Sequence, residues 1–191
     1  MQSLNLELLP LEQQHLVRRA AAAMETEFAG TFGRETVERF VADSLEQLLP
    51  SARLTTTTAP AVLFMCVRNA GRSQMAVGWL RHLTHGSVMV WSAGSEPGAA
   101  INDAAVEAMA EVGIDISEEF PKPWTDEVVQ AADVVVTMGC GDACPVYPGK
   151  RYEDWVLESS TGNDVDSARA VRDEIRMRVE RLAASISSVV R

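Results

Sequence analysis

The sequence has few cysteines and no segment that would carry it into or across a membrane. Its 191 residues include three cysteines, a small and odd number that excludes a disulfide-rich secreted scaffold. No apolar run is long enough to span a bilayer, and Met1 to Pro10 lack the basic start and apolar core of a signal peptide. We therefore expect a cytoplasmic protein with no membrane partner, whose cysteines are candidates for redox chemistry.

Acidic residues are missing from one long stretch of an otherwise acidic chain. The formal net charge is −10, which argues against a nucleic acid as a partner. Between Glu46 and Glu96, however, there is no Asp or Glu at all. The basic residues of this interval are Arg53, Arg68, Arg72 and Arg81. Local positive charge in an acidic chain favours binding of a small anion.

The first part of the chain has a helical pattern and is separated from the rest by a polar segment. Apolar residues recur at helical spacing over 16–28 and again over 37–49. The segment 51–60, which contains consecutive threonines, is typical of a linker. We predict an all-α N-terminal helical bundle at 1–56 and a catalytic domain at 57–191.

From Ala61 onward, short apolar segments alternate with helical patterns. The predicted strands are 61–65, 88–91, 134–138 and a weaker one at 152–157, and the predicted helices are 75–83, 105–112 and 171–189. Strands separated by helices favour a parallel sheet covered on both faces, so we expect an α/β three-layer sandwich with a four-stranded sheet. In such folds ligands bind beyond the carboxyl ends of the strands.

The segment after the first predicted strand combines a thiol with residues suited to anion binding. Cys66 begins a short loop that leads through Arg72 and Ser73 into a helical pattern. Loop N–H groups at a helix N-terminus favour a tetrahedral anion, and the same field favours the thiolate form of Cys66. The alternative is a buried structural cysteine. The predicted oxyanion-binding residues are Val67, Arg68, Asn69, Ala70, Gly71, Arg72 and Ser73.

A pair of cysteines follows the third predicted strand. Cys140 and Cys144 are separated by three residues and flanked by glycines and a proline. Because Cys66 and Cys140 each follow the carboxyl end of a predicted parallel strand, we expect them to meet at one edge of the sheet. A zinc site and simple packing are the alternatives. The cysteines and histidines lack the ligand-pair spacing of structural zinc sites, so we predict no metal.

These motifs together resemble the arsenate reductases that share the fold of the low-molecular-weight protein tyrosine phosphatases. The matching segments, in chain order, are 66–76, 91–94, 112–115, 138–140 and 148–155. The resemblance extends from Ala61 to the C-terminus. Gln74 stands where the phosphatases usually have proline after the Arg-Ser pair, and together with Cys140 and Cys144 it favours the reductase branch.

The resemblance implies that arsenate is the substrate, with phosphate or sulfate as mimics. It implies that Cys66 attacks arsenate held by Arg72 and the loop amides. Ser73 would hydrogen-bond the sulfur, and Asn69 would brace the loop. No bound cofactor is implied.

The resemblance further implies a thiol–disulfide cascade. Cys140 would attack Cys66, releasing arsenite, and Cys144 would then attack Cys140, leaving a Cys140–Cys144 disulfide. An external thiol reductant would restore the pair. Thioredoxin is the expected reductant, and mycothiol with mycoredoxin is the alternative.

One departure from the family concerns the general acid. The Asp-Asp-Pro motif that usually follows the last strand corresponds here to Glu158–Ser160, so a serine occupies the usual position of the acid. Glu158 is the candidate acid, and a solvated loop carboxylate is the alternative. Two other functions remain open: a low-molecular-weight protein tyrosine phosphatase, and a non-catalytic arsenic or redox sensor.

Overall fold

Four strands and four helices make up the part of the chain that the computed structural model describes, residues 59–140, 144–157 and 164–189. In order they are β1 (Ala61–Cys66), α3 (Arg72–Thr84), β2 (Met89–Gly94), α4 (Asp103–Ala110), α5 (Asp126–Ala131), β3 (Val134–Met138), β4 (Arg151–Asp154) and α6 (Val165–Val189). The alternation of strands and helices confirms the predicted α/β class. The helical bundle predicted at 1–56 lies outside the described residues.

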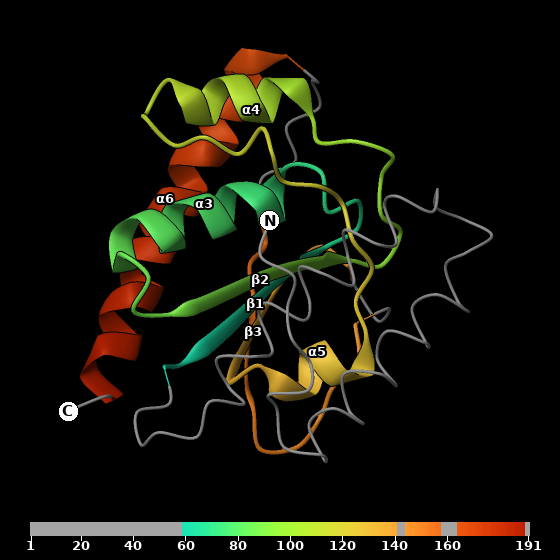
Figure 1. Cartoon of the computed structure of the whole chain (residues 1–191), viewed down its shortest axis with the longest axis vertical. Helices are drawn as coiled ribbons and strands as arrows, with labels where there is room; N and C mark the ends of the chain where they lie inside the picture. The colour runs from blue at the N-terminus through green and yellow to red at the C-terminus, as the bar shows by residue number, and fades with distance from the viewer. Residues whose placement is uncertain (1–58, 141–143, 158–163, 190–191) are drawn as a thin grey trace, which may run out of the picture. The chain divides into compact units, whose positions relative to one another are not determined.

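All four strands run parallel in one sheet, in the order β2-β1-β3-β4 (Figure 1). The first strand in the chain is therefore a central one, with β2 and β3 as its neighbours. In the register of these pairs, Cys66 lies opposite Gly94 of β2 and Met138 of β3. The last residue of β1 is thus flanked on both sides by the ends of neighbouring strands, where the sheet opens to ligands.

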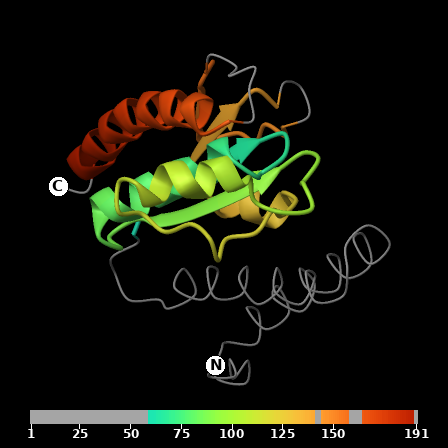
Figure 2. The ribbon, with the colours of Figure 1, turned by 90° about the horizontal axis from the view of Figure 1, so that it is seen from above.

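The sheet is covered on both faces, which is why every residue of β1 is buried. Val62, Phe64 and Cys66 belong to an apolar cluster with residues of α3, α4 and α6. Leu63 and Met65 belong to a second cluster, which includes Val129 of α5. Alternate residues of a strand point to opposite faces, so these clusters are the two sides of one sheet. The predicted three-layer sandwich is confirmed. Among the described helices, α5 covers one face of the sheet, and α3, α4 and α6 lie on the other (Figure 2).

Local hydrogen bonds explain where the observed helices differ from the predicted ones. α4 begins two residues earlier than predicted because the Asn102 side chain accepts a hydrogen bond from Ala105 N and caps the helix. α5 was not predicted. Its 6 residues are too few to show a helical repeat, and it begins where Thr125 accepts from Val128 N.

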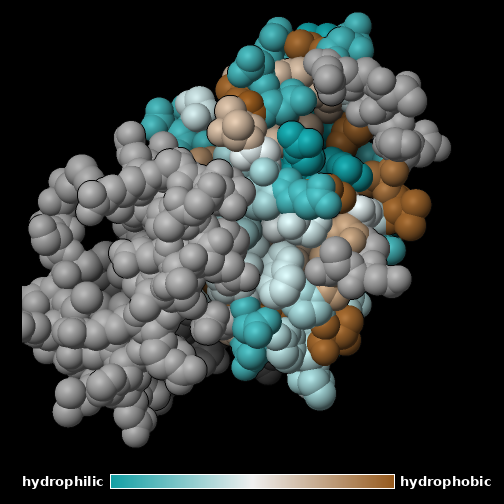
Figure 3. All heavy atoms as spheres, turned by 90° about the vertical axis from the view of Figure 1, so that its right-hand side faces the viewer, coloured by the Kyte–Doolittle hydropathy of each residue, from teal (hydrophilic) through white to brown (hydrophobic). Residues whose placement is uncertain are grey.

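The described surface has few large apolar side chains. Those that are exposed are Val146, Val156 and Met177. In the view of Figure 3 apolar residues lie in separate small groups among polar ones. Within the described ranges, none of the helices is both long and apolar enough to cross a membrane.

Candidate active site

The Cys66 sulfur lies at the end of β1 and is the acceptor of a small hydrogen-bond network. Its side chain is buried, and its Sγ accepts a hydrogen bond from Asn69 N at 3.2 Å. Ser73 Oγ, from the first turn of α3, lies 3.1 Å from the same sulfur. The sulfur is thus held in place by one backbone group and one side chain of the loop and helix that follow it.

The side chain of Asn69 sets the direction of the hydrogen bond between Ser73 and Cys66. Asn69 Nδ2 donates to Ser73 Oγ at 2.8 Å, so the serine hydroxyl is free to direct its own hydrogen at the sulfur. Asn69 itself is fully buried and has a φ of 46°. Asparagine adopts this left-handed conformation more readily than most residues, which explains its use at the tightest point of the loop.

A buried glutamine fastens the loop to the segment that follows α4. Gln74 Nε2 donates to Asn69 O at 3.0 Å, to Asn69 Oδ1 at 3.1 Å and to Phe120 O at 3.1 Å. Lys122 N also donates to Asn69 Oδ1, at 2.8 Å. In the sequence, Gln74 stood out only as a residue that separates two branches of a family. Its position one residue after Ser73, at the start of a helix, was the available signal for a positioning role.

The start of α3 is suited to an anion. Gly71 is its N-cap, no described side chain caps the exposed N–H groups, and its first turn has no acidic residue. Arg72 is its first residue. A Cβ built on Gly139 would lie 3.2 Å from Arg72 Nη1, so the guanidinium lies against the backbone just before Cys140. Gly139 has a φ of 79°, which also favours glycine there.

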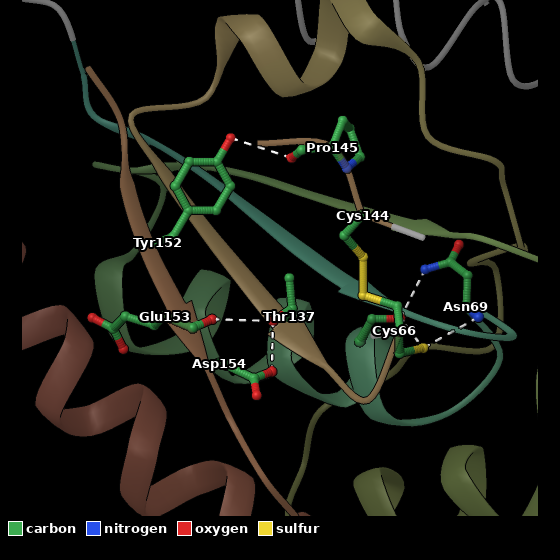
Figure 4. Close-up of a disulfide and its surroundings, with 10 residues drawn as sticks. Cys66, Asn69, Thr137, Cys144, Pro145, Tyr152, Glu153 and Asp154 are labelled. Carbon is green, nitrogen blue, oxygen red and sulfur yellow. Dashed lines mark hydrogen bonds between the residues drawn. A yellow bond between two sulfur atoms is a disulfide. The ribbon is translucent and has the colours of Figure 1, made fainter. Parts of the chain in front are cut away.

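The other two cysteines lie at the same edge of the sheet. A disulfide joins Cys140 to Cys144, and Cys66 is the free cysteine. Cys140 follows Met138, the register partner of Cys66, by two residues. Figure 4 shows the disulfide at the edge where Cys66 and Asn69 lie. Cys140 is only 7% exposed, whereas Cys144 is half-buried.

Two tyrosines, which no sequence motif had indicated, hold the chain that follows the disulfide. The Tyr152 hydroxyl accepts from Tyr147 N at 2.8 Å and lies 3.4 Å from Pro145 O, to which it donates. The Tyr147 hydroxyl donates to Asp126, and this hydrogen bond raises the pKa of Tyr147 above its usual value. The segment after Cys144 is thereby tied to both α5 and β4.

Some of the residues considered from sequence are not part of this site or cannot be placed in it. Glu158 lies outside the described residues, so its role as a general acid stays a prediction. His82 and His85 are exposed in and after the last turn of α3, at the opposite end of that helix from Ser73. Over the described ranges, no three His, Cys, Asp or Glu side chains are grouped as a metal site requires.

Gly94 gives a direct test of how tightly the loop packs. A Cβ at this position would lie 2.7 Å from Val67 O and 3.0 Å from Asn69 Cβ. We expect Gly94→Ala to lower the free energy of unfolding by about 1–3 kcal/mol, because backbone atoms of the loop must shift, and to weaken phosphate binding. Urea denaturation and isothermal titration calorimetry measure the two effects.

The matched control is Gly98→Ala, also at a buried position beside the loop. A Cβ there would meet Ala70 Cβ and Arg68 O at 3.6 Å, an ordinary contact distance. We expect the stability and phosphate affinity of this variant to stay near those of the wild type. Equal losses in the two variants would contradict the proposed close packing at Gly94.

Comparison with known protein families gives two matches along the chain. The model of the low molecular weight phosphotyrosine protein phosphatases matches residues 61–191. A protein-tyrosine-phosphatase-like N-terminal domain matches residues 17–62. The first match covers the sheet, the Cys66 loop and the disulfide.

Curated relatives carry a more specific name. A glutaredoxin arsenate reductase of Synechocystis is 39% identical over 129 residues, which are 66% of this chain and 98% of that protein. An arsenate reductase of Staphylococcus xylosus is 39% identical over 123 residues, which are 62% of this chain and 92% of that protein.

Solved structures agree with these relatives. A thioredoxin-dependent arsenate reductase of Corynebacterium glutamicum has a TM-score of 0.69 and 36% identity, over 92% of this chain and 98% of that one. An arsenate reductase in a phosphate-binding state has a TM-score of 0.58 and 36% identity, over 66% of this chain and 98% of that one. The chain therefore belongs to the family of the low molecular weight phosphotyrosine protein phosphatases, and within it is similar to the arsenate reductases.

Proposed function

We propose that the protein reduces arsenate to arsenite. The observation that carries this proposal is the free Cys66 in an anion-binding loop, at the same edge of the sheet as the Cys140–Cys144 disulfide. A phosphatase uses the loop but has no need of an additional pair of thiols. The curated relatives are named arsenate reductases, and this chain aligns with nearly the whole length of each. Their names therefore support the same substrate.

The first step is nucleophilic attack by the Cys66 thiolate on arsenic. A sulfur–arsenic bond forms, the bond between arsenic and one of its hydroxyl groups breaks, and the departing hydroxyl takes up one proton and leaves as water. Arg72 and the N–H groups at the start of α3 hold the remaining oxygens and stabilise their charge. Glu158 is the candidate donor of the proton.

The second step moves two electrons from thiols to arsenic, and the third step regenerates Cys66. Cys140 attacks Cys66 Sγ, a disulfide forms, and the sulfur–arsenic electron pair stays with arsenic, which leaves as arsenite. Cys144 then attacks Cys140, and Cys66 leaves as a thiolate. A Cys140–Cys144 disulfide with a free Cys66 is the end state of this sequence, so the bonding in the structure supports it.

A coupled assay tests the proposed function. Purified protein is mixed with arsenate, thioredoxin, thioredoxin reductase and NADPH, and NADPH oxidation is followed together with arsenite release. We expect one NADPH to be consumed per arsenite, and little hydrolysis of an aryl phosphate. Efficient aryl phosphate hydrolysis without arsenite release would favour the phosphatase. A lack of turnover with a persistent disulfide to Cys66 would favour the sensor.

We further propose that thioredoxin is the reductant and that its thiolate attacks Cys144. Cys144 is half-buried, whereas Cys140 is only 7% exposed, so the first is the more accessible sulfur. The similarity to a thioredoxin-dependent reductase supports this partner. Replacing thioredoxin by mycothiol and mycoredoxin in the same assay tests the alternative.

Val146 is the candidate contact for the reductant. Its side chain is 78% exposed two residues from Cys144, and the backbone on either side of it is held by the Tyr152 hydroxyl. We expect Val146→Glu to raise the KM for thioredoxin at least about fivefold, the usual effect of losing a central apolar contact. Turnover driven by dithiothreitol should not change.

The control for this substitution is Met177→Glu, which adds the same charge at another exposed apolar residue. Met177 is 53% exposed on α6, whose buried residues pack on the α3 side of the sheet, away from the cluster that contains Cys140. We expect its KM for thioredoxin to match the wild type. The docking proposal is wrong if both variants change the KM equally, or if Val146→Glu slows the dithiothreitol reaction to the same extent.

A further inference from the structure

A buried lysine lies directly behind the Cys66 loop and has no part in the chemistry described so far. Lys122 is only 4% exposed. Its Nζ lies 3.6 Å from Glu119 Oε2 and 4.1 Å from the centre of the Phe120 ring. Glu119 also forms an ion pair with Arg81 of α3. Burying an ammonium group is costly, and an apolar side chain of similar length would fill the space at lower cost.

The backbone of Lys122 connects the two elements that support the loop. Its N–H donates to Asn69 Oδ1 at 2.8 Å, and its carbonyl accepts from Gly94 N at 2.9 Å. Pro121 and Pro123 flank it and have no N–H, so Lys122 provides the backbone donor of this tripeptide. A shift of the lysine would therefore move the Asn69 amide.

The contact with Asn69 is the first in a series of hydrogen bonds that ends on the nucleophile. Lys122 N donates to Asn69 Oδ1, Asn69 Nδ2 donates to Ser73 Oγ, and Ser73 Oγ lies 3.1 Å from Cys66 Sγ. Each donor in the series points toward the sulfur. Hydrogen bonds in series polarise one another, so a change at Lys122 N is felt at the sulfur.

We propose that Lys122 is a positioning residue for the Cys66 loop. Its ammonium, held by the Glu119 carboxylate and the Phe120 ring, fixes the 121–123 tripeptide against Asn69. Loss of this ion pair loosens the tripeptide and so reduces both the affinity for a tetrahedral oxyanion and the reactivity of the Cys66 sulfur. The inference rests on the proposed function only for the identity of the nucleophile.

The oxidised protein allows this to be measured without catalysis. Its disulfide occupies two of the three cysteines, so Cys66 is the remaining thiol. The readouts are the rate of Cys66 alkylation by iodoacetamide near neutral pH and the Kd for inorganic phosphate from titration calorimetry. For Lys122→Met we expect the alkylation rate to fall and the phosphate Kd to rise, each roughly tenfold, as for other residues that orient a reactive group from behind.

Chemical rescue separates the charge from mere filling of space. Lys122→Ala lacks the part of the side chain that n-propylammonium resembles. We expect added n-propylammonium to restore phosphate affinity and alkylation rate, and n-propanol, its neutral counterpart, to have little effect. Equal rescue by both compounds, or a Lys122→Met protein with wild-type phosphate Kd and alkylation rate, would overturn the proposal. Arsenate is not used in either readout, so failure of arsenate reduction would leave this result intact.

Discussion

Replacing Cys66 by serine is expected to abolish arsenate reduction. The serine hydroxyl is far less nucleophilic than a thiolate and cannot form the disulfide through which electrons leave the protein. In the coupled assay with thioredoxin, NADPH oxidation should fall to the rate seen without the protein. No arsenite should be released, even with excess dithiothreitol.

The loop itself should survive this substitution. Asn69 N and Ser73 Oγ, which now contact Cys66 Sγ at 3.2 Å and 3.1 Å, can contact a serine hydroxyl instead. We therefore expect Cys66→Ser to keep the phosphate Kd of the wild type within a small factor. Arsenite release by a variant with intact phosphate binding would show that another thiol attacks arsenate.

Replacing Cys144 by serine should give a protein that completes one reduction and stops. Cys140 is still able to attack Cys66, so about one arsenite per chain is expected before the Cys66–Cys140 disulfide blocks further reaction. Rapid quenching with acid and arsenite quantification measure the burst. Peptide mapping without reductant identifies the disulfide.

The companion variant, Cys140→Ser, distinguishes the order of the two resolving thiols. If Cys140 attacks first, this variant should release almost no arsenite without added dithiol. A burst equal to that of Cys144→Ser, with a Cys66–Cys144 disulfide, would reverse the proposed order. Either result leaves Cys66 as the nucleophile, because both variants retain it.

The sheet and the Cys66 loop could be predicted because their signals are local in the sequence. β1 is a continuous apolar run, as a strand buried on both faces must be, and it ends at Cys66. β4 was harder to predict. It ends at Asp154, and the apolar residues beyond it that suggested a longer strand include Trp155, which is buried against Phe64 with ring centres 5.7 Å apart.

The support behind the loop could not be predicted from sequence spacing. Lys122 and Asn69 are 53 residues apart, and Gln74 and Phe120 are 46 apart, yet each pair is joined by a hydrogen bond. Such contacts depend on how the segment after α4 passes the end of β2. Lysine and glutamine are usually exposed, and nothing in the residues next to Lys122 and Gln74 reveals that these two are buried.

The two apolar clusters that cover the sheet should affect how the protein unfolds on warming. Cys66 belongs to the cluster formed with α3, α4 and α6, whereas Cys140 belongs to the one that includes α5. Local opening events follow such packing units. On warming, the backbone amides around Cys66 and those around Cys140 should therefore lose their protection from hydrogen exchange at different temperatures. A partly opened molecule would then keep only one of its two activities. With the α5 side open, it would still bind the anion but could not reduce the adduct on Cys66. With the α3 side open, it would still exchange disulfides but could not bind the anion.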